Sequence, residues 1–186
     1  MKAVITGHSG EIGQIVKNIF PDYEWIDVGR SSDIDLRTDQ GVNDLLKFSK
    51  YADIFFNIAN VGPNQGYILK KVFEIFLKQK NKDPKKIINF GSLITTLDSN
   101  FQENKQDYIS SKLYLEKVHK ECCDQHINGW QLDYAVPQSI LIRFGHILEK
   151  EERGKQPYTN KDQLIEVVRY AVESKSYISD IDVRWQ

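Results

Sequence analysis

Three side chains in the middle of the sequence have types and spacings suited to proton transfer. Tyr108 and Lys112 are four residues apart, so on a helix they lie one turn apart on the same face. An ammonium beside a phenol favours the phenolate, which brings a group with a pKa of about 10 towards neutrality. Such a phenol can give a proton to a carbonyl oxygen or take one from an alcohol. Ser92 ends an apolar run, at a place where its hydroxyl can hydrogen-bond the same oxygen.

The same spacing occurs a second time in the chain, at Tyr67 and Lys71. Only position separates the two pairs. Tyr108 opens the helix that follows the run ending in Ser92. Tyr67 lies in a helix that is apolar nearly all round, where packing in the core is the expected role. Position therefore favours Tyr108 as the acid/base.

Three regularly spaced glycines lie near the N-terminus, in the stretch TGHSGEIG from Thr6 to Gly13. A short apolar run precedes them and a helical pattern follows. At such a turn a side chain on Gly7 or Gly10 would obstruct the approach of a pyrophosphate to the backbone, and Gly13 allows close packing of helix and sheet. A glycine triplet also fits an ordinary turn, but this setting favours nucleotide binding.

The elements that must position these residues alternate along the chain. Strands are expected at 2–6, 24–28, 33–36, 52–60, 85–92, 138–145 and 176–185. Helices are expected at 12–19, after a Thr38 cap, at 64–80, at 106–123 and at 164–172. The strand at 33–36 is expected to be rudimentary, because too few residues separate it from its predecessor for a parallel crossover. The pattern predicts an α/β fold: a Rossmann-like doubly wound parallel sheet with helices on both faces, in one domain spanning 1–186.

Five stretches, in the same order, resemble the short-chain dehydrogenase/reductase family, in its extended or atypical form. TGHSGEIG has the family's glycine spacing, and NIAN (57–60) resembles its Asn-Asn-Ala-Gly. INFGS ends where the family keeps its catalytic serine, YISSK gives the Tyr-x-x-x-Lys pair, and YISDIDVRW resembles the last strand. The resemblance spans nearly the whole chain. It implies a dinucleotide-dependent oxidoreductase with Ser92, Tyr108 and Lys112 as catalytic residues.

The resemblance also implies which residues hold the cofactor. Lys112 would bind the nicotinamide ribose, and Asp35 with Leu36 resembles the family pair that places a carboxylate beside the adenine amino group. The expected cofactor-binding residues are Gly7, His8, Ser9, Gly10, Glu11, Ile12, Gly13, Arg30, Ser31, Asp35, Leu36, Asn57, Ile58, Ala59, Tyr108 and Lys112.

The end of the second strand indicates which dinucleotide is preferred. An acidic residue there binds the ribose hydroxyls of NAD, and a basic one accommodates the phosphate of NADP. Gly29 stands at the acidic position, followed by Arg30 and Ser31, which suit a phosphate. NADP is therefore the expected cofactor. NAD remains the alternative, because a shift of one residue in the alignment brings Asp27 near the ribose.

Other candidate sites are weaker. Asn64 is the nearest match to a family asparagine that relays protons, although helix capping is its favoured role. His119, Cys122, Cys123 and His126 resemble a zinc motif, but one helix spreads the two histidines roughly 10 Å apart along its axis, too far for one ion. We therefore expect no metal site within one chain, and a half-site completed by another chain is the alternative. The charged run 149–155 is expected to be a solvated loop, with a substrate lid as the second reading. Phe144 stands where the family usually has proline, which leaves a nicotinamide contact there open.

Composition limits the classes of protein that need to be considered. The chain has 186 residues, a net charge of -1 and only two cysteines, which are adjacent. These features give no basic footprint for nucleic acid and no disulfide framework. The sequence contains no signal peptide pattern and no apolar stretch of about 20 residues. We expect a soluble, cytoplasmic protein.

Two functional hypotheses remain. The first is an NADP-dependent carbonyl reductase or alcohol dehydrogenase acting on a small carbonyl or alcohol substrate. The second is a non-catalytic NAD(P)-binding redox sensor or regulatory protein. We also expect a homodimer or homotetramer formed through helices 64–80 and 105–123. The reason is that the first of these helices is too apolar to be covered by the sheet alone.

Overall fold

A six-stranded parallel sheet forms the centre of the computed structural model, which describes residues 1–96, 105–129, 132–147 and 158–183. In chain order its strands are β1 (Lys2–Thr6), β2 (Glu24–Val28), β3 (Ile54–Asn57), β4 (Lys86–Phe90), β5 (Gln138–Phe144) and β8 (Asp180–Val183). They lie side by side in the order β2-β1-β3-β4-β5-β8, and every pair is parallel. A separate two-stranded sheet pairs β6 (His146–Ile147) with β7 (Tyr158–Thr159).

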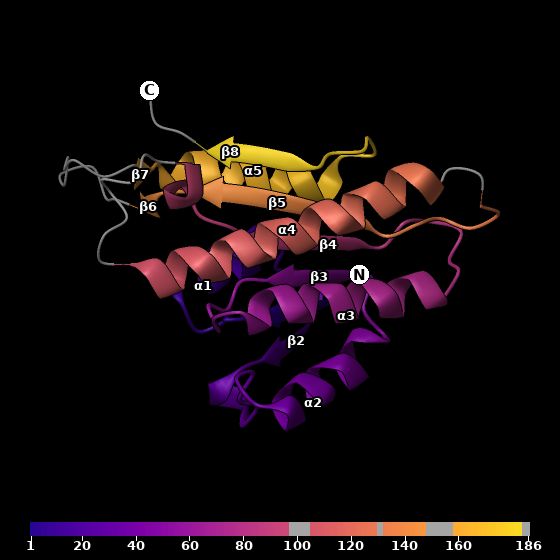
Figure 1. Cartoon of the computed structure of the whole chain (residues 1–186), viewed down its shortest axis with the longest axis horizontal. Coiled ribbons are helices and arrows are strands. Elements are labelled where there is room, and N and C mark those ends of the chain that lie inside the picture. The colour runs from indigo at the N-terminus through magenta and orange to yellow at the C-terminus, as the bar shows by residue number, and fades with distance from the viewer. Residues whose placement is uncertain (97–104, 130–131, 148–157, 184–186) are drawn as a thin grey trace.

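Helices cover both faces of the large sheet. They are α1 (Glu11–Ile19), α2 (Asp39–Ser49), α3 (Asn64–Lys78), α4 (Gln106–Asn128) and α5 (Lys161–Glu173), with short 3-10 turns η1 (Arg30–Ser32) and η2 (Leu93–Thr96). Figure 1 shows α2, α3 and α4 in front of the sheet, while α1 and α5 pack together on the other face. The predicted doubly wound sheet is therefore confirmed.

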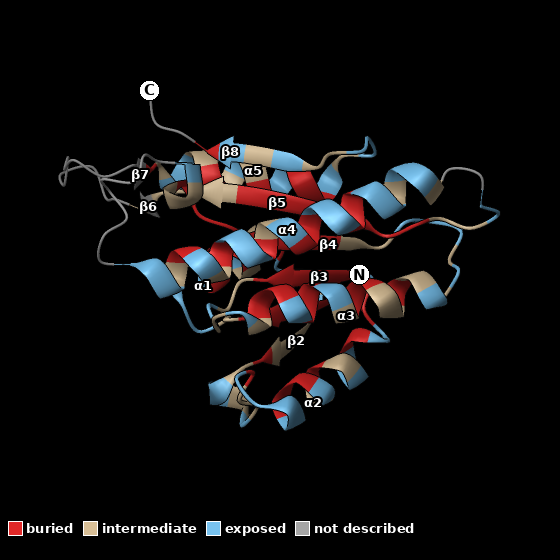
Figure 2. Ribbon diagram, in the orientation of Figure 1, coloured by how far each residue is buried: buried red, intermediate tan, exposed pale blue. Residues whose placement is uncertain are grey.

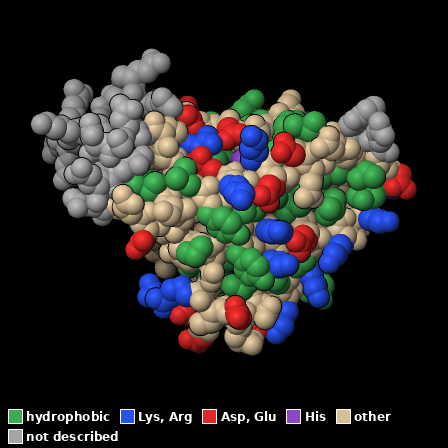
Figure 3. Space-filling view, viewed as in Figure 1, with side chains coloured by type: hydrophobic (Ala, Val, Ile, Leu, Met, Phe, Trp, Pro, Cys, Tyr) green, Lys and Arg blue, Asp and Glu red, His purple; other side chains and the backbone are tan. Residues whose placement is uncertain are grey.

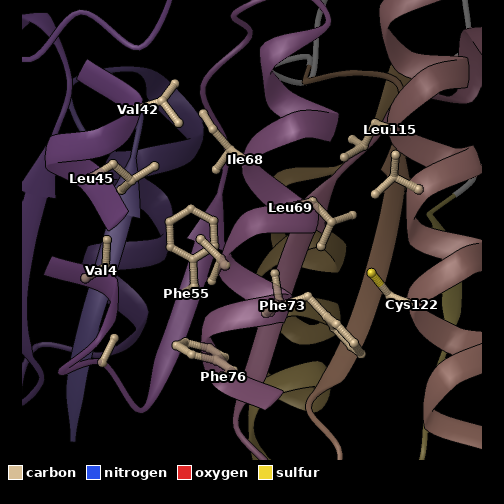
Figure 4. Close-up of a cluster of buried hydrophobic side chains, with 14 of the residues drawn as sticks. Val4, Val42, Leu45, Phe55, Ile68, Leu69, Phe73, Phe76, Leu115 and Cys122 are labelled. Carbon is tan, nitrogen blue, oxygen red and sulfur yellow. The ribbon is translucent and has the colours of Figure 1, made fainter. Parts of the chain in front are cut away.

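The two helix layers enclose two hydrophobic cores, because successive side chains of a strand point to opposite faces. Phe55 and Ile87 pack with α2, α3 and α4, as Figure 4 shows for part of that cluster. Ile54, Phe56 and Ile88 pack with α1 and α5. The central strands are accordingly buried along their length (Figure 2). Both faces are covered by helices, which explains why the strands are near-continuous apolar runs.

The third expected strand, at 33–36, is absent: these residues form the connection between β2 and α2. Asp33 is left-handed, with a φ of 59°, and the chain then passes directly into the α2 N-cap. That cap is Thr38, as predicted, and its hydroxyl oxygen accepts a hydrogen bond from the Gly41 amide at 3.1 Å. The connection is too short to place a further parallel strand beside β2.

Helix α3 packs between α2 and α4 within one chain. Its apolar residues Ile68, Leu69, Val72, Phe73 and Phe76 are each at most 2% exposed. The argument for an oligomer assumed that this strip would be open, and that assumption is wrong because two neighbouring helices cover it. Tyr67 was assigned to the core, yet it is 41% exposed. The oligomer itself stays a prediction.

None of the described helices is both long enough and apolar enough to cross a lipid bilayer.

Candidate active site

The turn between β1 and α1 is built by the three glycines of TGHSGEIG. Gly7 has a φ of 71°, a left-handed conformation that favours glycine. A Cβ on Gly7 would lie 3.0 Å from the Ala59 amide nitrogen, and one on Gly13 would lie 2.4 Å from the Gly7 carbonyl oxygen. Gly10 is the N-cap of α1 and supplies no capping side chain. The first N–H groups of α1 are therefore available to an anion.

A cavity of about 420 Å³ adjoins this turn. Most of the predicted cofactor residues line it: Gly7, His8, Ser9, Gly10, Glu11, Ile12, Gly13, Arg30, Ser31, Asp35, Leu36, Ile58 and Ala59. Gly29 and Asn60, which lie in stretches discussed above, also line it. So do Ile34, Arg37 and Val61, which the sequence did not single out. The fold thus brings together the segments that follow β1, β2 and β3. Asn57, Tyr108 and Lys112, which were predicted to bind the same cofactor, are not among the lining residues.

The rim formed after β2 is rich in polar groups. The imidazole Nε2 of His8 lies 2.9 Å from the hydroxyl of Ser31, which joins the glycine turn to the end of β2. Arg37 holds Asp35 through two hydrogen bonds of 2.9 and 2.7 Å from its guanidinium. These bonds hold the pKa of the Asp35 carboxyl at about 2, so the group is ionised at neutral pH. Arg30 is exposed at the same rim.

Asp27, the residue that left NAD open, lies elsewhere. Its carboxylate accepts two hydrogen bonds from Lys17 on α1, at 2.9 and 2.7 Å, and it does not line the cavity. The carboxylate at the cavity rim that follows β2 is Asp35 instead, and Arg37 already engages it.

The segment after β3 is fixed from behind by buried side chains. The hydroxyl oxygen of Thr6 accepts hydrogen bonds from the amides of Ile58 and Ala59, at 3.0 and 3.1 Å. The Asn57 side chain is 1% exposed and donates to the Gln65 carbonyl and to Asn89, each at 3.0 Å. Asn57 therefore supports the loop from inside the protein, while Ile58 and Ala59 face the cavity.

Lys112 lies on the buried side of α4 and is only 4% exposed. Its ammonium donates to the Gln65 side-chain oxygen at 2.8 Å and to the Phe90 carbonyl at 3.0 Å. Burial lowers the pKa of Lys112 to about 8, although nearby Glu116 opposes the shift. The same nitrogen lies 5.6 Å from the centre of the Tyr108 ring. An ammonium has three donors, so one N–H remains beyond the two bonds to the protein.

Ser92 lies two residues beyond β4 and is 9% exposed. Its hydroxyl oxygen accepts a hydrogen bond from the Ile94 amide at 3.3 Å. The following turn is tied to α4, because Thr95 donates to Glu116 at 2.6 Å. Phe90, which accepts from Lys112, is the last residue of β4. The structure therefore gathers the predicted catalytic residues at the carboxyl edge of the sheet, where open α/β sheets bind ligands.

The second Tyr-x-x-x-Lys pair has a different environment. Lys71 donates to Glu74 on the outer surface of α3 at 3.1 Å, and Tyr67 is exposed beside it. Only the Tyr108 pair has a lysine that is buried and bonded to the end of a strand.

Gln65 is the site residue that the sequence analysis missed. It is 1% exposed, and its amide nitrogen donates to the Asn57 carbonyl at 3.0 Å while its side-chain oxygen accepts from Lys112. A row of polar side chains continues from there, because Asn57 donates to Asn89, which donates to Ser139 at 3.0 Å. A signal did exist in the sequence. Gln65 is a polar residue on the helical face that otherwise carries the buried residues of α3.

Asn64, the candidate that was weighed instead, is not part of this row. Its amide donates to the Leu36 carbonyl at 2.9 Å, which ties the start of α3 to the connection after β2. The favoured capping role is also wrong, because Pro63 is the N-cap of α3 and no side chain caps the helix.

The charged run 149–155, expected to be a solvated loop or a substrate lid, lies outside the described residues. Phe144 ends β5 and packs edge-on against Phe90, with ring centres 6.0 Å apart. In the described part of the chain, no three His, Cys, Asp or Glu side chains are arranged to hold a metal ion.

Known proteins match this chain in fold but not in sequence. No protein-family model matches the sequence, and no curated protein matches it. Solved structures do match. A GDP-L-fucose synthetase from Naegleria fowleri bound to NADP has a TM-score of 0.70 at 11% identity, covering 100% of this chain and 72% of that one.

Two further structures match over a similar length. The yeast methylglyoxal/isovaleraldehyde reductase Gre2, complexed with NADPH, has a TM-score of 0.68 at 12% identity, covering 99% of this chain and 75% of that one. A short-chain type dehydrogenase/reductase from Mycobacterium marinum has a TM-score of 0.71 at 14% identity, covering 98% and 92%. At such low identity these similarities establish the fold alone.

Proposed function

We propose that the chain is an NADP-dependent oxidoreductase of the short-chain dehydrogenase/reductase type, in which residues 1–186 form one dinucleotide-binding domain. It would transfer hydride between NADP(H) and a small carbonyl or alcohol substrate. One observation carries the proposal: the buried ammonium of Lys112, held by Gln65 and Phe90, lies 5.6 Å from the Tyr108 ring at the carboxyl edge of the sheet. This arrangement suits a phenol that must release and recover a proton.

The cavity after β1 fits a dinucleotide. Gly7, Gly10 and Gly13 keep side chains away from the turn, and the uncapped N-terminus of α1 suits a pyrophosphate. The imidazole Nδ1 of His8 is buried in the same turn without a hydrogen-bond partner among the described residues. A buried polar atom of this kind indicates that a bound group completes the site.

When bound, the dinucleotide supplies the hydride or accepts it. In the reduction direction Tyr108 gives its phenolic proton to the substrate oxygen, and Lys112 stabilises the phenolate that remains. Ser92 donates a hydrogen bond to the same oxygen. Gln65 and the Phe90 carbonyl fix the lysine nitrogen, so that its charge stays directed at the phenol.

Two side chains support NADP over NAD. Arg30 and Ser31 stand at the rim of the cavity after β2, where a ribose phosphate needs charge and donors. Asp27 is withdrawn from that rim by Lys17. Two of the matching structures contain NADP or NADPH, which agrees with this preference.

The test is turnover with a matched pair of tyrosine variants. The protein is mixed with NADPH and a panel of small aldehydes, ketones and quinones, and oxidation of NADPH is followed. Tyr108→Phe should lose activity by about a hundredfold or more, the usual contribution of a positioned acid/base. Tyr67→Phe, which alters the surface copy of the same spacing, should behave as the parent. Absence of turnover across the panel, or equal rates for Tyr108→Phe and the parent, would overturn the proposal.

Dinucleotide binding without turnover would instead favour the second hypothesis, a non-catalytic sensor. Binding is measured separately, by the change in NADPH fluorescence on addition of the protein. The two readouts therefore distinguish a failed enzyme assignment from a failed cofactor assignment.

A further inference from the structure

A second cavity, of about 460 Å³, lies between α4 and the strand edge formed by β5 and β8. The cofactor residues do not line it. Its lining includes His119, Cys123, Arg143, Tyr177 and Asp180, of which Cys123 is the nucleophilic group. Figure 3 shows acidic and basic side chains gathered between α4 and the β8 edge, with a histidine visible among them.

The Cys123 thiol is surrounded by hydrogen-bonding groups. Its sulfur lies 3.4 Å from Nε2 of His119, and it also bonds to the Ser139 carbonyl at 3.8 Å. Burial and a hydrogen bond with Cys123 raise the pKa of Tyr177. A phenol and an imidazole thus both face the sulfur, and each can donate to a thiolate.

His119 is held in the form that favours a thiolate. Its Nε2 lies 3.5 Å from the Asp180 carboxylate, and its Nδ1 lies 2.8 Å from the Ser139 hydroxyl. Burial opposes protonation, but the hydrogen bonds with Asp180 and Cys123 outweigh it and raise the pKa of His119 to about 9. An imidazolium beside a thiol stabilises the thiolate, which is the nucleophilic species.

Both thiols are buried, with Cys122 3% and Cys123 7% exposed, but their surroundings differ. Cys122 lies in the hydrophobic cluster between α3 and α4, as Figure 4 shows. Burial raises the pKa of the Cys122 thiol to about 12, which keeps it protonated and unreactive. Cys122 can therefore serve as an internal control for the reactivity of Cys123.

The charges around the cavity indicate which reagent it admits. Arg143 is engaged by carboxylates on three sides: Glu116 at 3.1 Å, Asp180 at 2.9 Å and Asp182 at 3.1 Å. Lys117 and Lys120 line the same cavity, and neither forms an ion pair within the part of the chain that the structure describes. An anionic molecule is therefore favoured.

We propose that Cys123 is a reactive thiol that undergoes disulfide exchange with small anionic disulfides entering this cavity. The thiolate attacks one sulfur of the disulfide, whose S–S bond breaks. A mixed disulfide forms on Cys123 and the other half leaves as a thiolate. The proton that Cys123 gave up passes to the solvent or to the leaving thiolate, depending on the acidity of that thiol. The disulfide is itself the oxidant, so the reaction needs no other.

The first test counts and locates the reactive thiols. The native protein is mixed with the dianionic disulfide dithiobis(nitrobenzoate), and release of the coloured thiolate is followed before and after addition of urea. One cysteine should react in the native state and the second only after unfolding. Cys123→Ala should lose the native reaction and Cys122→Ala should keep it. Mass-spectrometric sequencing of the labelled parent peptide assigns the thiol even if one variant fails to fold.

The second test examines the cause of the reactivity. His119→Gln should slow the native reaction at least about tenfold, because it removes the imidazole that lies 3.4 Å from the Cys123 sulfur and stabilises the attacking thiolate. Lys117→Gln with Lys120→Gln should slow dithiobis(nitrobenzoate) and leave the neutral disulfide dithiodipyridine unaffected. The proposal is overturned if neither thiol reacts until urea is added, if the label lies on Cys122, or if His119→Gln reacts as fast as the parent.

Discussion

Replacing Gln65 by leucine removes the side-chain oxygen that accepts from Lys112 at 2.8 Å, while the carbonyl of Phe90 at 3.0 Å remains. Leucine is close to glutamine in size and suits a position that is 1% exposed. It also removes the amide that donates to the carbonyls of Asn57 and Phe90. The loss of the accepting oxygen is the part of the change that acts on the charged state of the lysine. We expect the pKa of Lys112 to fall further below its ordinary value.

The size of the fall follows from the hydrogen bond that is lost. Burial already lowers the pKa of Lys112 from 10.5 to about 8. A hydrogen bond to a charged group contributes about 1.5–3 kcal/mol, and one pKa unit corresponds to about 1.4 kcal/mol. Gln65→Leu should therefore lower the pKa by about one to two units, to roughly 6–7. At neutral pH the lysine would lose much of its charge.

The sign of the effect on stability is fixed by linkage. The unfolded lysine titrates near 10.5 and the folded one near 8, so the unfolded chain binds more protons between these pH values. Lys112 therefore makes the free energy of unfolding rise with pH across that window, and its cost is fully present below it. In Gln65→Leu the rise should begin about one to two pH units lower.

The assay is NMR titration of the Lys112 side chain, assigned with Lys112→Met, together with urea unfolding across the same pH range. Gln79→Leu is the matched control, because Gln79 follows the other end of α3 and donates to the Lys50 carbonyl instead. The reasoning is refuted if the Lys112 pKa in Gln65→Leu stays within about 0.3 unit of the parent value, since that is far less than one lost hydrogen bond.

Four other changes test separate parts of the structure. Arg30→Ala should weaken NADPH binding by about tenfold and NADH binding much less, because only NADPH presents a phosphate to the guanidinium; fluorescence titration with both dinucleotides measures it, and equal losses would contradict the assignment. Gly13→Ala should lower the free energy of unfolding by about 1–3 kcal/mol, because its Cβ meets the Gly7 carbonyl, while Gly10→Ala, with no neighbour closer than 3.5 Å, should fold as the parent does. Lys86→Met should cost about 2 kcal/mol in urea unfolding, since Lys86 donates to the carbonyls of Ala171, Val172 and Ser174 at the end of α5, and exposed Lys161→Met should change little. Sedimentation equilibrium should show a dimer, and Tyr67→Glu should convert it to a monomer. The reason is that α3 and the first half of α4 expose the apolar side chains of Tyr67, Leu113 and Tyr114. A monomeric parent protein would contradict the predicted oligomer.

Hydrophobic periodicity was sufficient to predict the architecture. Both faces of the strands are apolar and the helices have one apolar side, so the order of elements and the parallel sheet followed from the sequence. The wrong predictions concern segments whose structure depends on the elements that surround them. Residues 33–36 have the composition of a strand, but the connection after β2 is too short for them to pair in parallel with the free edge of β2. The breadth of apolar surface on α3 indicated a partner, and the partners are α2 and α4 of the same chain.

Within the candidate site, residues with backbone roles were easier to find than residues that act through others. The glycines at 7, 10 and 13 and the Tyr108–Lys112 spacing are visible as local patterns. Gln65 shows only as a polar residue on the buried face of its helix, and its role depends on Asn57, Phe90 and Lys112, which come from three other elements. The zinc-like pattern from His119 to His126 likewise depends on the directions of its side chains. Adjacent residues on a helix point in different directions, so Cys122 lies in the core and Cys123 lines the second cavity.

The row of polar side chains behind Lys112 has a consequence for strand alignment. A parallel strand that is apolar on both faces makes nearly the same contacts if it slides along its neighbour, so burial alone discriminates weakly between alignments. Asn57 is paired directly with Asn89 across β3 and β4, and Asn89 donates to Ser139 on β5. If β3 slipped by one residue against β4, or β4 against β5, an amide side chain would point into an apolar environment without a hydrogen-bond partner. The cost would be about 1–3 kcal/mol for each such group. These three side chains therefore help to fix the register of the strands. They keep the ends of β3 and β4 side by side beneath the site of the proposed chemistry.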